Sequence, residues 1–253
     1  MFNPFSLNGK IIVITGASSG IGRQCAIDCS KMGARVVLVA RNEDRLNETR
    51  SQMEGDGHLV VTQDLTDFNA IPEIVTRIVE KVGALDGILH CAGISETVPL
   101  KLVDVEKMES FFRSNVLGAV MLTKEVCKPG NVNKDGASIV FFASVMGVVG
   151  ESCKSVYSLT KGALISGARS LAVEYSKKKI RVNCVSPGVI ETPINANQNY
   201  MKDPVLRAKF ESKHLLGFGQ SSDISNTCIY LLSDASRWVT GQNLVVDGGY
   251  TVR

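Results

Sequence analysis

The sequence lacks the features that mark metal-binding and disulfide-rich proteins. None of its seven cysteines belongs to a CxxC pair, and its three histidines cluster neither with one another nor with cysteines. Structural zinc sites and disulfide frameworks depend on such spacings. We therefore expect no metal site and reduced cysteines, which is the pattern typical of a cytoplasmic protein.

Strong net charge and long apolar runs are missing as well. The net charge is only +3 over 253 residues, whereas proteins that bind nucleic acids carry clustered positive charge. No segment approaches the roughly 18 consecutive apolar residues of a membrane span. The N-terminus, MFNPFSLNGK, has neither the basic start nor the apolar core of a signal peptide. We expect a cytoplasmic protein with no nucleic-acid partner and no membrane partner.

What the sequence does contain is a regular alternation of short β-branched runs and longer amphipathic stretches. Continuous apolar strands separated by helices are typical of a parallel sheet covered on both faces. The pattern predicts one doubly wound, Rossmann-type α/β domain over residues 1–253, with about seven strands. The expected strands are 10–15, 35–40, 58–63, 86–90, 137–143, 180–185 and 244–246, and the expected helices include 21–32, 43–53, 69–82, 103–127 and 155–176.

Residues 191–220 interrupt this alternation with prolines, asparagines and a short helical stretch. They follow the sixth expected strand, and insertions at the carboxyl ends of strands often cover ligands. We interpret this stretch, called the lid segment below, as a substrate lid, with a plain surface loop as the alternative. Met146, Val148, Val149 and Cys153 are expected to line the pocket from the opposite side.

The turn after the first expected strand is rich in glycine, with the spacing GxxxGxG. Glycines permit a tight turn there, and they let backbone N–H groups approach a phosphate at a helix N-terminus. A purely structural turn is the alternative. The predicted cofactor contacts are Gly16, Ser18, Ser19, Gly20, Ile21 and Gly22.

The end of the second expected strand decides between the two nicotinamide dinucleotides. Folds that select NAD usually place an acidic residue there to bind the ribose hydroxyls, but this chain has Ala40 and Arg41. The planar fork of Arg41 suits a 2′-phosphate, and Ser18 and Asn42 could add hydrogen bonds. The sequence therefore favours NADP(H) over NAD(H), unless Arg41 is simply a surface cation.

Two further strand ends supply candidate cofactor contacts. The Asp64 carboxylate could accept the adenine amino group, with Leu65 against the ring. The alternative is that Asp64 caps the next helix, although Asp67 is better placed for that. The small residues Cys91, Ala92 and Gly93 would let the backbone lie along the cofactor.

Three side chains between residues 144 and 161 could handle a proton together. Tyr157 and Lys161 are four residues apart in an expected helix, so they share one face. Ser144 lies just beyond the fifth expected strand. An ammonium group favours the phenolate, so we expect Lys161 to lower the pKa of Tyr157. Tyr157 would exchange a proton with a carbonyl or alcohol, and Ser144 would bind the same oxygen.

These features together resemble the short-chain dehydrogenase/reductase family, and most closely its 3-oxoacyl-[acyl-carrier-protein] reductase-like branch. Two features depart from the family pattern: His90-Cys91 stands where Asn-Asn is usual, and Val173 stands where acyl-carrier-protein reductases tend to carry an arginine. The matching pieces run in the family's order from Lys10 to Tyr250: Thr15–Gly22, Asp64, Cys91–Gly93, Asn115, Ser144, Tyr157–Lys161, Pro187-Gly188 and Asp247–Gly249.

The resemblance implies further roles. Asn115 would be a fourth catalytic residue that holds a proton-relaying water, and Lys161 would also reach the nicotinamide ribose. Pro187 and Gly188 would fix a turn, while Val189, Ile190 and Thr192 would contact the nicotinamide end. Family members pair through their long helices and their C-terminal segment, which implies a homotetramer or homodimer.

The leading hypothesis is an NADPH-dependent oxidoreductase acting on a small-molecule carbonyl or secondary alcohol, with 3-oxoacyl thioesters as one substrate class. An NADP-linked dehydrogenase for a sugar, polyol or steroid-type alcohol is the alternative within the same enzyme class. The alternative from another class is a non-catalytic NADPH-binding regulator, which the complete set of Asn115, Ser144, Tyr157 and Lys161 disfavours.

Overall fold

The computed structural model describes residues 2–196 and 198–252 and contains one seven-stranded, all-parallel sheet. Its strand order is β3-β2-β1-β4-β5-β6-β7, so the chain reverses its winding direction between β1 and β4. This topology confirms the predicted doubly wound fold. The strands are β1 (Ile11–Thr15), β2 (Arg35–Ala40), β3 (Leu59–Thr62), β4 (Gly87–His90), β5 (Ala137–Phe142), β6 (Ile180–Pro187) and β7 (Asn243–Val246).

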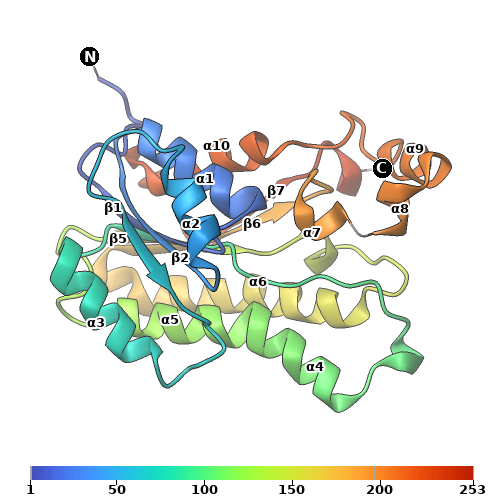
Figure 1. Ribbon diagram of the computed structural model, residues 1–253, viewed down its shortest axis with the longest axis horizontal. Helices are drawn as coiled ribbons and strands as arrows, with labels where there is room; N and C mark the ends of the chain where they lie inside the picture. Colours follow the sequence, from blue (N-terminus) through green and yellow to red (C-terminus); the bar gives the residue numbers. More distant parts are fainter. Residues whose placement is uncertain (1, 197, 253) are drawn as a thin grey trace.

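Helices cover the sheet on both faces (Figure 1). On one face lie α1 (Gly20–Lys31) and α10 (Ser221–Leu232); on the other lie α3 (Ile71–Val82), α5 (Gly118–Val126) and α6 (Ser155–Tyr175). Strand side chains alternate between the two cores: Ile12 and Ile14 pack toward α1 and α10, whereas Val13 and Val37 pack toward α3, α5 and α6. Burial on both sides explains why the central strands are continuously apolar.

The long helix expected over 103–127 is divided in the structure. It consists of α4 (Val105–Phe112), a π-helical turn (Arg113–Leu117) and α5. A π-turn holds one residue more than an α-turn and often occurs at functional sites. Asn115 lies in this turn and is buried.

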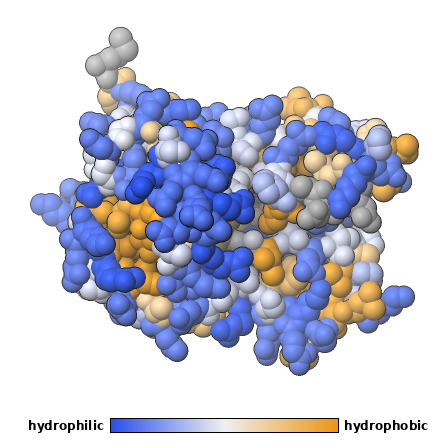
Figure 2. All heavy atoms as spheres, in the orientation of Figure 1, coloured by the Kyte–Doolittle hydropathy of each residue, from blue (hydrophilic) through white to orange (hydrophobic). Residues whose placement is uncertain are grey.

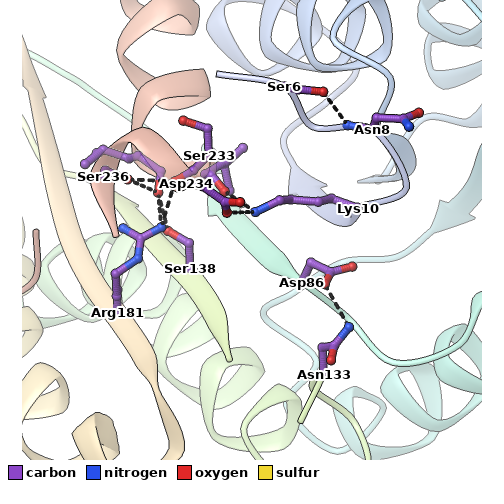
Figure 3. A network of polar contacts seen from close by, with 12 residues as sticks. Ser6, Asn8, Lys10, Asp86, Asn133, Ser138, Arg181, Ser233, Asp234 and Ser236 are labelled. Carbon is purple, nitrogen blue, oxygen red and sulfur yellow. Dashed lines mark hydrogen bonds and ion pairs between the residues drawn. The ribbon is translucent and has the colours of Figure 1, made fainter. Parts of the chain in front are cut away.

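The amino-terminal edge of the sheet is held by a polar network (Figure 3). Lys10 bonds to Asp234 at 2.7 Å, and Asp86 accepts from the amide of Asn133 at 3.1 Å. Arg181 donates to the carbonyl oxygens of Leu231 and Ser233, at 2.7 and 3.4 Å. These bonds join the starts of the strands to the end of α10 and to the loop before β5. They lie at the opposite end of the strands from the glycine turn.

The lid segment forms three short helices after β6: α7 (Pro193–Ala196), α8 (Asn199–Lys202) and α9 (Pro204–Glu211). Figure 2 shows that hydrophilic residues cover most of the visible face, with a hydrophobic patch at the left beside α3 and smaller hydrophobic areas on the right. On α9, Val205 is 77% exposed. Among the described residues, none of the helices has the length and apolar character that crossing a bilayer demands.

Candidate active site

The carboxyl ends of the strands surround a cavity of about 590 Å³. Its wall comes from the loops after β1, β2, β3, β4, β5 and β6, together with the start of α6 and part of the lid segment. Every predicted site residue except Asn115 lines it: Gly16, Ser18–Gly22, Arg41, Asn42, Asp64, Leu65, Cys91–Gly93, Ser144, Tyr157, Lys161, Pro187–Ile190 and Thr192.

The glycine turn forms one end of this cavity because its backbone approaches neighbouring segments too closely for side chains. Gly16 has a φ of +65°, and a Cβ there would lie 2.9 Å from the backbone nitrogen of Ala92. A Cβ on Gly22 would collide with the carbonyl of Gly16. The N-terminus of α1, which lines the cavity, and this bare backbone fit a pyrophosphate, which needs N–H donors without obstructing side chains.

Arg41 stands at the adenosine end. Its side chain is 77% exposed, and Nη1 lies 3.9 Å from Oδ2 of Asp64. The other Asp64 oxygen accepts from the backbone N–H and hydroxyl of Thr66. Those Thr66 bonds, together with the Arg41 charge, lower the pKa of Asp64, so it is a carboxylate at neutral pH. The exposed Arg41 side chain is accessible to a phosphate.

Asp64 and Asn42 differ in whether they cap a helix. The alternative of a capping Asp64 is wrong, since α3 begins at Ile71 with Ala70 at its N-cap. Asn42 does cap a helix: its Oδ1 accepts from the N–H of Arg45 at the start of α2 (Glu43–Arg50), and its NH₂ group can donate to a ligand. Arg45, which the sequence reasoning missed, also lines the cavity.

The three proton-handling candidates meet at the other end. Ser144 caps a 3₁₀ turn (Val145–Gly147), and its hydroxyl both accepts from the N–H of Met146 and hydrogen-bonds Tyr157. Tyr157 lies in the first turn of α6, and the Nζ of Lys161 is 5.5 Å from its ring centroid. Lys161 donates to the carbonyl of Phe142 at 2.7 Å.

Burial, and not Lys161, dominates the titration of Tyr157. Burial raises the pKa of Tyr157 to about 12, although the Ser144 bond opposes it. The expectation that the pKa of Tyr157 would be lowered by Lys161 is therefore wrong. Burial also lowers the pKa of Lys161 to about 8. Tyr157 is consequently a protonated acid at neutral pH, which suits proton donation to a carbonyl oxygen.

Asn115 lies behind the cavity wall. Its Oδ1 accepts from the N–H of Ile94 at 2.7 Å, and its Nδ2 donates to the Ile94 carbonyl and to Thr160, both at 3.1 Å. A Cβ on Gly93 would lie 2.9 Å from this Oδ1. The side chain thereby fixes the segment after β4 against α6, while the proton-relaying water remains a prediction.

The loop after β6 joins the cavity to the lid segment. A Cβ on Gly188 would lie 2.9 Å from the Cα of Asp247, so the turn requires a glycine. The N–H of Val189 donates to Nε2 of His214, and the carbonyl of Ile190 accepts from Asn195 at 2.9 Å. Thr192 donates to that same carbonyl at 3.3 Å.

The predicted apolar lining opposite the lid segment is only partly correct. Met146 lines the cavity, but Val148, Val149 and Cys153 do not. Ser95, Glu151, Lys154 and Tyr250, which the sequence reasoning missed, take their place together with Phe210 and His214 of the lid segment. These residues come from segments that lie far apart in the chain.

Comparison with known proteins shows the family of the chain. A family profile described as Enoyl-(Acyl carrier protein) reductase matches residues 16–251. A solved structure of a short-chain type dehydrogenase/reductase from Mycobacterium ulcerans superimposes with a TM-score of 0.90 at 29% identity, covering 98% of this chain and 92% of that one. The chain belongs to the short-chain dehydrogenase/reductase family. A Sinorhizobium meliloti 1021 structure assigned as a short-chain alcohol dehydrogenase gives 0.92 at 30% identity, covering 99% of both chains.

Relatives within the family are named for different substrates. A 3-oxoacyl-[acyl-carrier-protein] reductase of Bos taurus is 35% identical over 95% of this chain and 97% of its own length. A glucose 1-dehydrogenase of Gluconobacter oxydans is 33% identical over 96% and 92%. The short-chain dehydrogenase/reductase family consists of nicotinamide-dependent oxidoreductases that act on small molecules and are commonly oligomeric. Membership of the family therefore assigns the class of reaction to this chain, but it does not identify the substrate.

Proposed function

We propose that this protein is an NADPH-dependent reductase that converts the carbonyl group of a small molecule into a secondary alcohol. The observation that carries the proposal is the placement of Ser144, Tyr157 and Lys161 at one end of a cavity whose other end is bare glycine backbone and Arg41. A hydride carrier and a proton donor then meet in one space.

The cofactor would be held by residues from several loops. The turn from Gly16 to Gly22 would bind the pyrophosphate, and Arg41 with Arg45 would bind the 2′-phosphate. Asp64 and Leu65 would meet the adenine, and the loop from Pro187 to Thr192 would meet the nicotinamide end. No acidic residue ends β2, which supports NADPH over NADH.

The chain's own groups would then carry the proton chemistry. When bound, NADPH supplies the hydride that adds to the carbonyl carbon. The hydroxyls of Ser144 and Tyr157 would bind the carbonyl oxygen, and Tyr157 would donate its proton as negative charge develops there. Lys161, with its pKa lowered to about 8, can exchange a proton near neutral pH. In the reverse direction the same residues would accept a proton from an alcohol.

A second candidate is an NADP-linked dehydrogenase for a sugar or polyol. It is supported by the polar side chains at the substrate end, including Glu151, Lys154 and Asn195, and by the glucose 1-dehydrogenase relative. Against a carrier-protein substrate, Val173 on α6 is 76% exposed where an arginine would face the acidic carrier.

The decisive experiment measures NADPH and NADH oxidation by the purified protein with a panel of 3-oxoacyl thioesters, ketones and ketoses. We expect turnover with NADPH and little with NADH. Tyr157→Phe should lose nearly all turnover, by at least about 100-fold, while still binding NADPH. NADPH binding without turnover across the panel would instead indicate a regulator.

We also propose that residues 191–220 act as a lid, that the protein is a homotetramer or homodimer, and that it is cytoplasmic. The covering position of Asn195, Phe210 and His214 at the cavity supports the lid. Light scattering on the purified protein tests the assembly, and a monomer at micromolar concentration would contradict it.

A further inference from the structure

Lys154 is a cation at the substrate end whose position the reaction described above does not explain. It is the N-cap residue of α6 and lines the cavity. Its Nζ lies 5.8 Å from the ring centroid of Tyr157. It donates to the carbonyl of Glu96 at 3.1 Å and to the hydroxyl of Ser95 at 3.4 Å. An ammonium group has three donors, so one remains for a ligand.

The two carboxylates nearest to Lys154 are engaged elsewhere. Glu96 pairs with Lys107 at 2.7 Å. Glu151 accepts from the ammonium of Lys213 and from the hydroxyl of Tyr250, both at 3.1 Å. Among the described residues, no carboxylate lies within ion-pair distance of Lys154, so its charge lacks a direct counterion.

Two features make this placement unfavourable for the protein alone. Lys154 stands at the N-terminus of a 21-residue helix, where the helix dipole repels a cation. Burial lowers its pKa, although Glu151 and Glu96 act in the opposite direction. An anion beside Lys154 would relieve both penalties, because it would meet the ammonium and the positive end of α6 together.

We propose that the substrate is a small oxo acid, and that Lys154 binds its carboxylate while Tyr157 hydrogen-bonds its carbonyl oxygen. This inference rests on the proposed function and narrows its substrate class. The reaction is oxo acid + NADPH + H⁺ giving hydroxy acid + NADP⁺, with hydride on carbon and the proton of Tyr157 on oxygen.

The geometry favours a short oxo acid over a thioester. Lys154 and Tyr157 are within one helical turn, so a carbonyl and a carboxylate separated by a few carbon atoms reach both. A thioester carries no charge near its carbonyl and leaves Lys154 without an anion. One ammonium beside the Ser95 hydroxyl matches the two oxygens of a carboxylate.

The first test compares matched substrates. 2-Oxobutanoate, 3-oxobutanoate and 4-oxopentanoate are each assayed with NADPH against their methyl esters, which keep the carbonyl and lose the charge. We expect at least one acid to exceed its ester in kcat/KM. Lys154→Met should lower that acid-to-ester ratio by about 10- to 100-fold, the range for a hydrogen bond to a charged group. Lys154→Arg should retain most of the ratio.

Lys101→Met is the matched control, because it removes one positive charge from an exposed residue outside the cavity. It should leave the ratio unchanged. The inference is overturned if no wild-type ratio exceeds one, or if Lys154→Met and Lys101→Met behave alike.

The second test does not need turnover. Calorimetry measures binding of the same three acids and esters to the wild type and to Lys154→Met in the presence of NADP⁺. Acid binding that disappears with Lys154→Met supports the carboxylate site, and absence of acid binding to the wild type refutes it. Binding that depends on Lys154 without any NADPH oxidation would refute the proposed function and leave the carboxylate site standing.

Discussion

Replacing His90 with asparagine should remove a large part of the acid sensitivity of this protein. His90 ends β4 and is buried in the sheet. Its ring stacks on Phe141 with centroids 4.8 Å apart, and its Nε2 lies 2.8 Å from the hydroxyl of Thr123. Neither neighbour can carry a stabilising negative charge near neutral pH. Burial therefore lowers the pKa of His90 from 6.5 to about 3.

The sign and size of the effect follow from this shift. Between about pH 6.5 and pH 3 the unfolded chain binds a proton that the folded protein excludes, so stability falls as the pH falls through this window. Each pH unit within this window lowers the free energy of unfolding by about 1.4 kcal/mol. From pH 7 to pH 5, His90 alone should remove about 2 kcal/mol from the free energy of unfolding. Above pH 6.5 its contribution is constant.

Urea denaturation of the wild type and of His90→Asn, at pH 7 and pH 5 and at one protein concentration, measures this difference. Asparagine can keep a hydrogen bond to Thr123 without the titrating ring. From pH 7 to pH 5, the wild type should lose about 2 kcal/mol more of its free energy of unfolding than His90→Asn does. If both lose the same stability, His90 does not exclude a proton in the folded state.

Three further predictions concern the cofactor end and the lid segment. Arg41→Ala should raise the KM for NADPH by about 10- to 100-fold, because a charged bidentate contact is lost. The KM for NADH should change far less. Equal effects on both KM values would argue against a 2′-phosphate site. Gly16→Ala should weaken NADPH binding in a fluorescence titration by at least about tenfold, because a side chain at this positive φ also meets neighbouring backbone. Gly55→Ala is its control, since Gly55 has a φ of +79° but open space around it, and unchanged binding by both variants would contradict a pyrophosphate site at the glycine turn. Glu151→Gln should weaken the partly buried bond to Lys213 by about 1 kcal/mol or less, which trypsin should detect as faster cleavage within residues 191–220; an unchanged rate would show that Glu151 does not hold the lid segment.

The fold was predictable because local rules and global topology agree. Strands such as β1 and β5 are apolar on both faces, which only a sheet covered by helices on both sides explains. The boundaries differ by a few residues, as where β6 continues to Pro187. The resemblance implied a bend in the helix at Asn115, but the residue pattern alone did not predict the π-turn, because these residues fit an uninterrupted helix equally well.

The candidate site was predictable where the backbone imposes it. The glycine turn needs residues without side chains, and Tyr157 and Lys161 are neighbours by helical spacing alone. Glu151 and Lys154 were missed because their surroundings come from segments 50 or more residues away, such as those carrying Ser95 and Lys213. The direction of the Tyr157 pKa shift was also missed, since burial depends on packing that no local pattern encodes.

The π-turn has a consequence for how this helix tolerates insertions and deletions. Deleting one residue between Arg113 and Leu117 would give an unbroken α-helix with a satisfied hydrogen-bond ladder. Because the wide turn accommodates the additional residue, α5 would nearly keep its orientation relative to α4, and Leu122 would stay in the core. The loss would fall on the turn itself, which would no longer hold Asn115 against Ile94. The number of residues in this turn is therefore constrained by the placement of Asn115 and not by the packing of the helix.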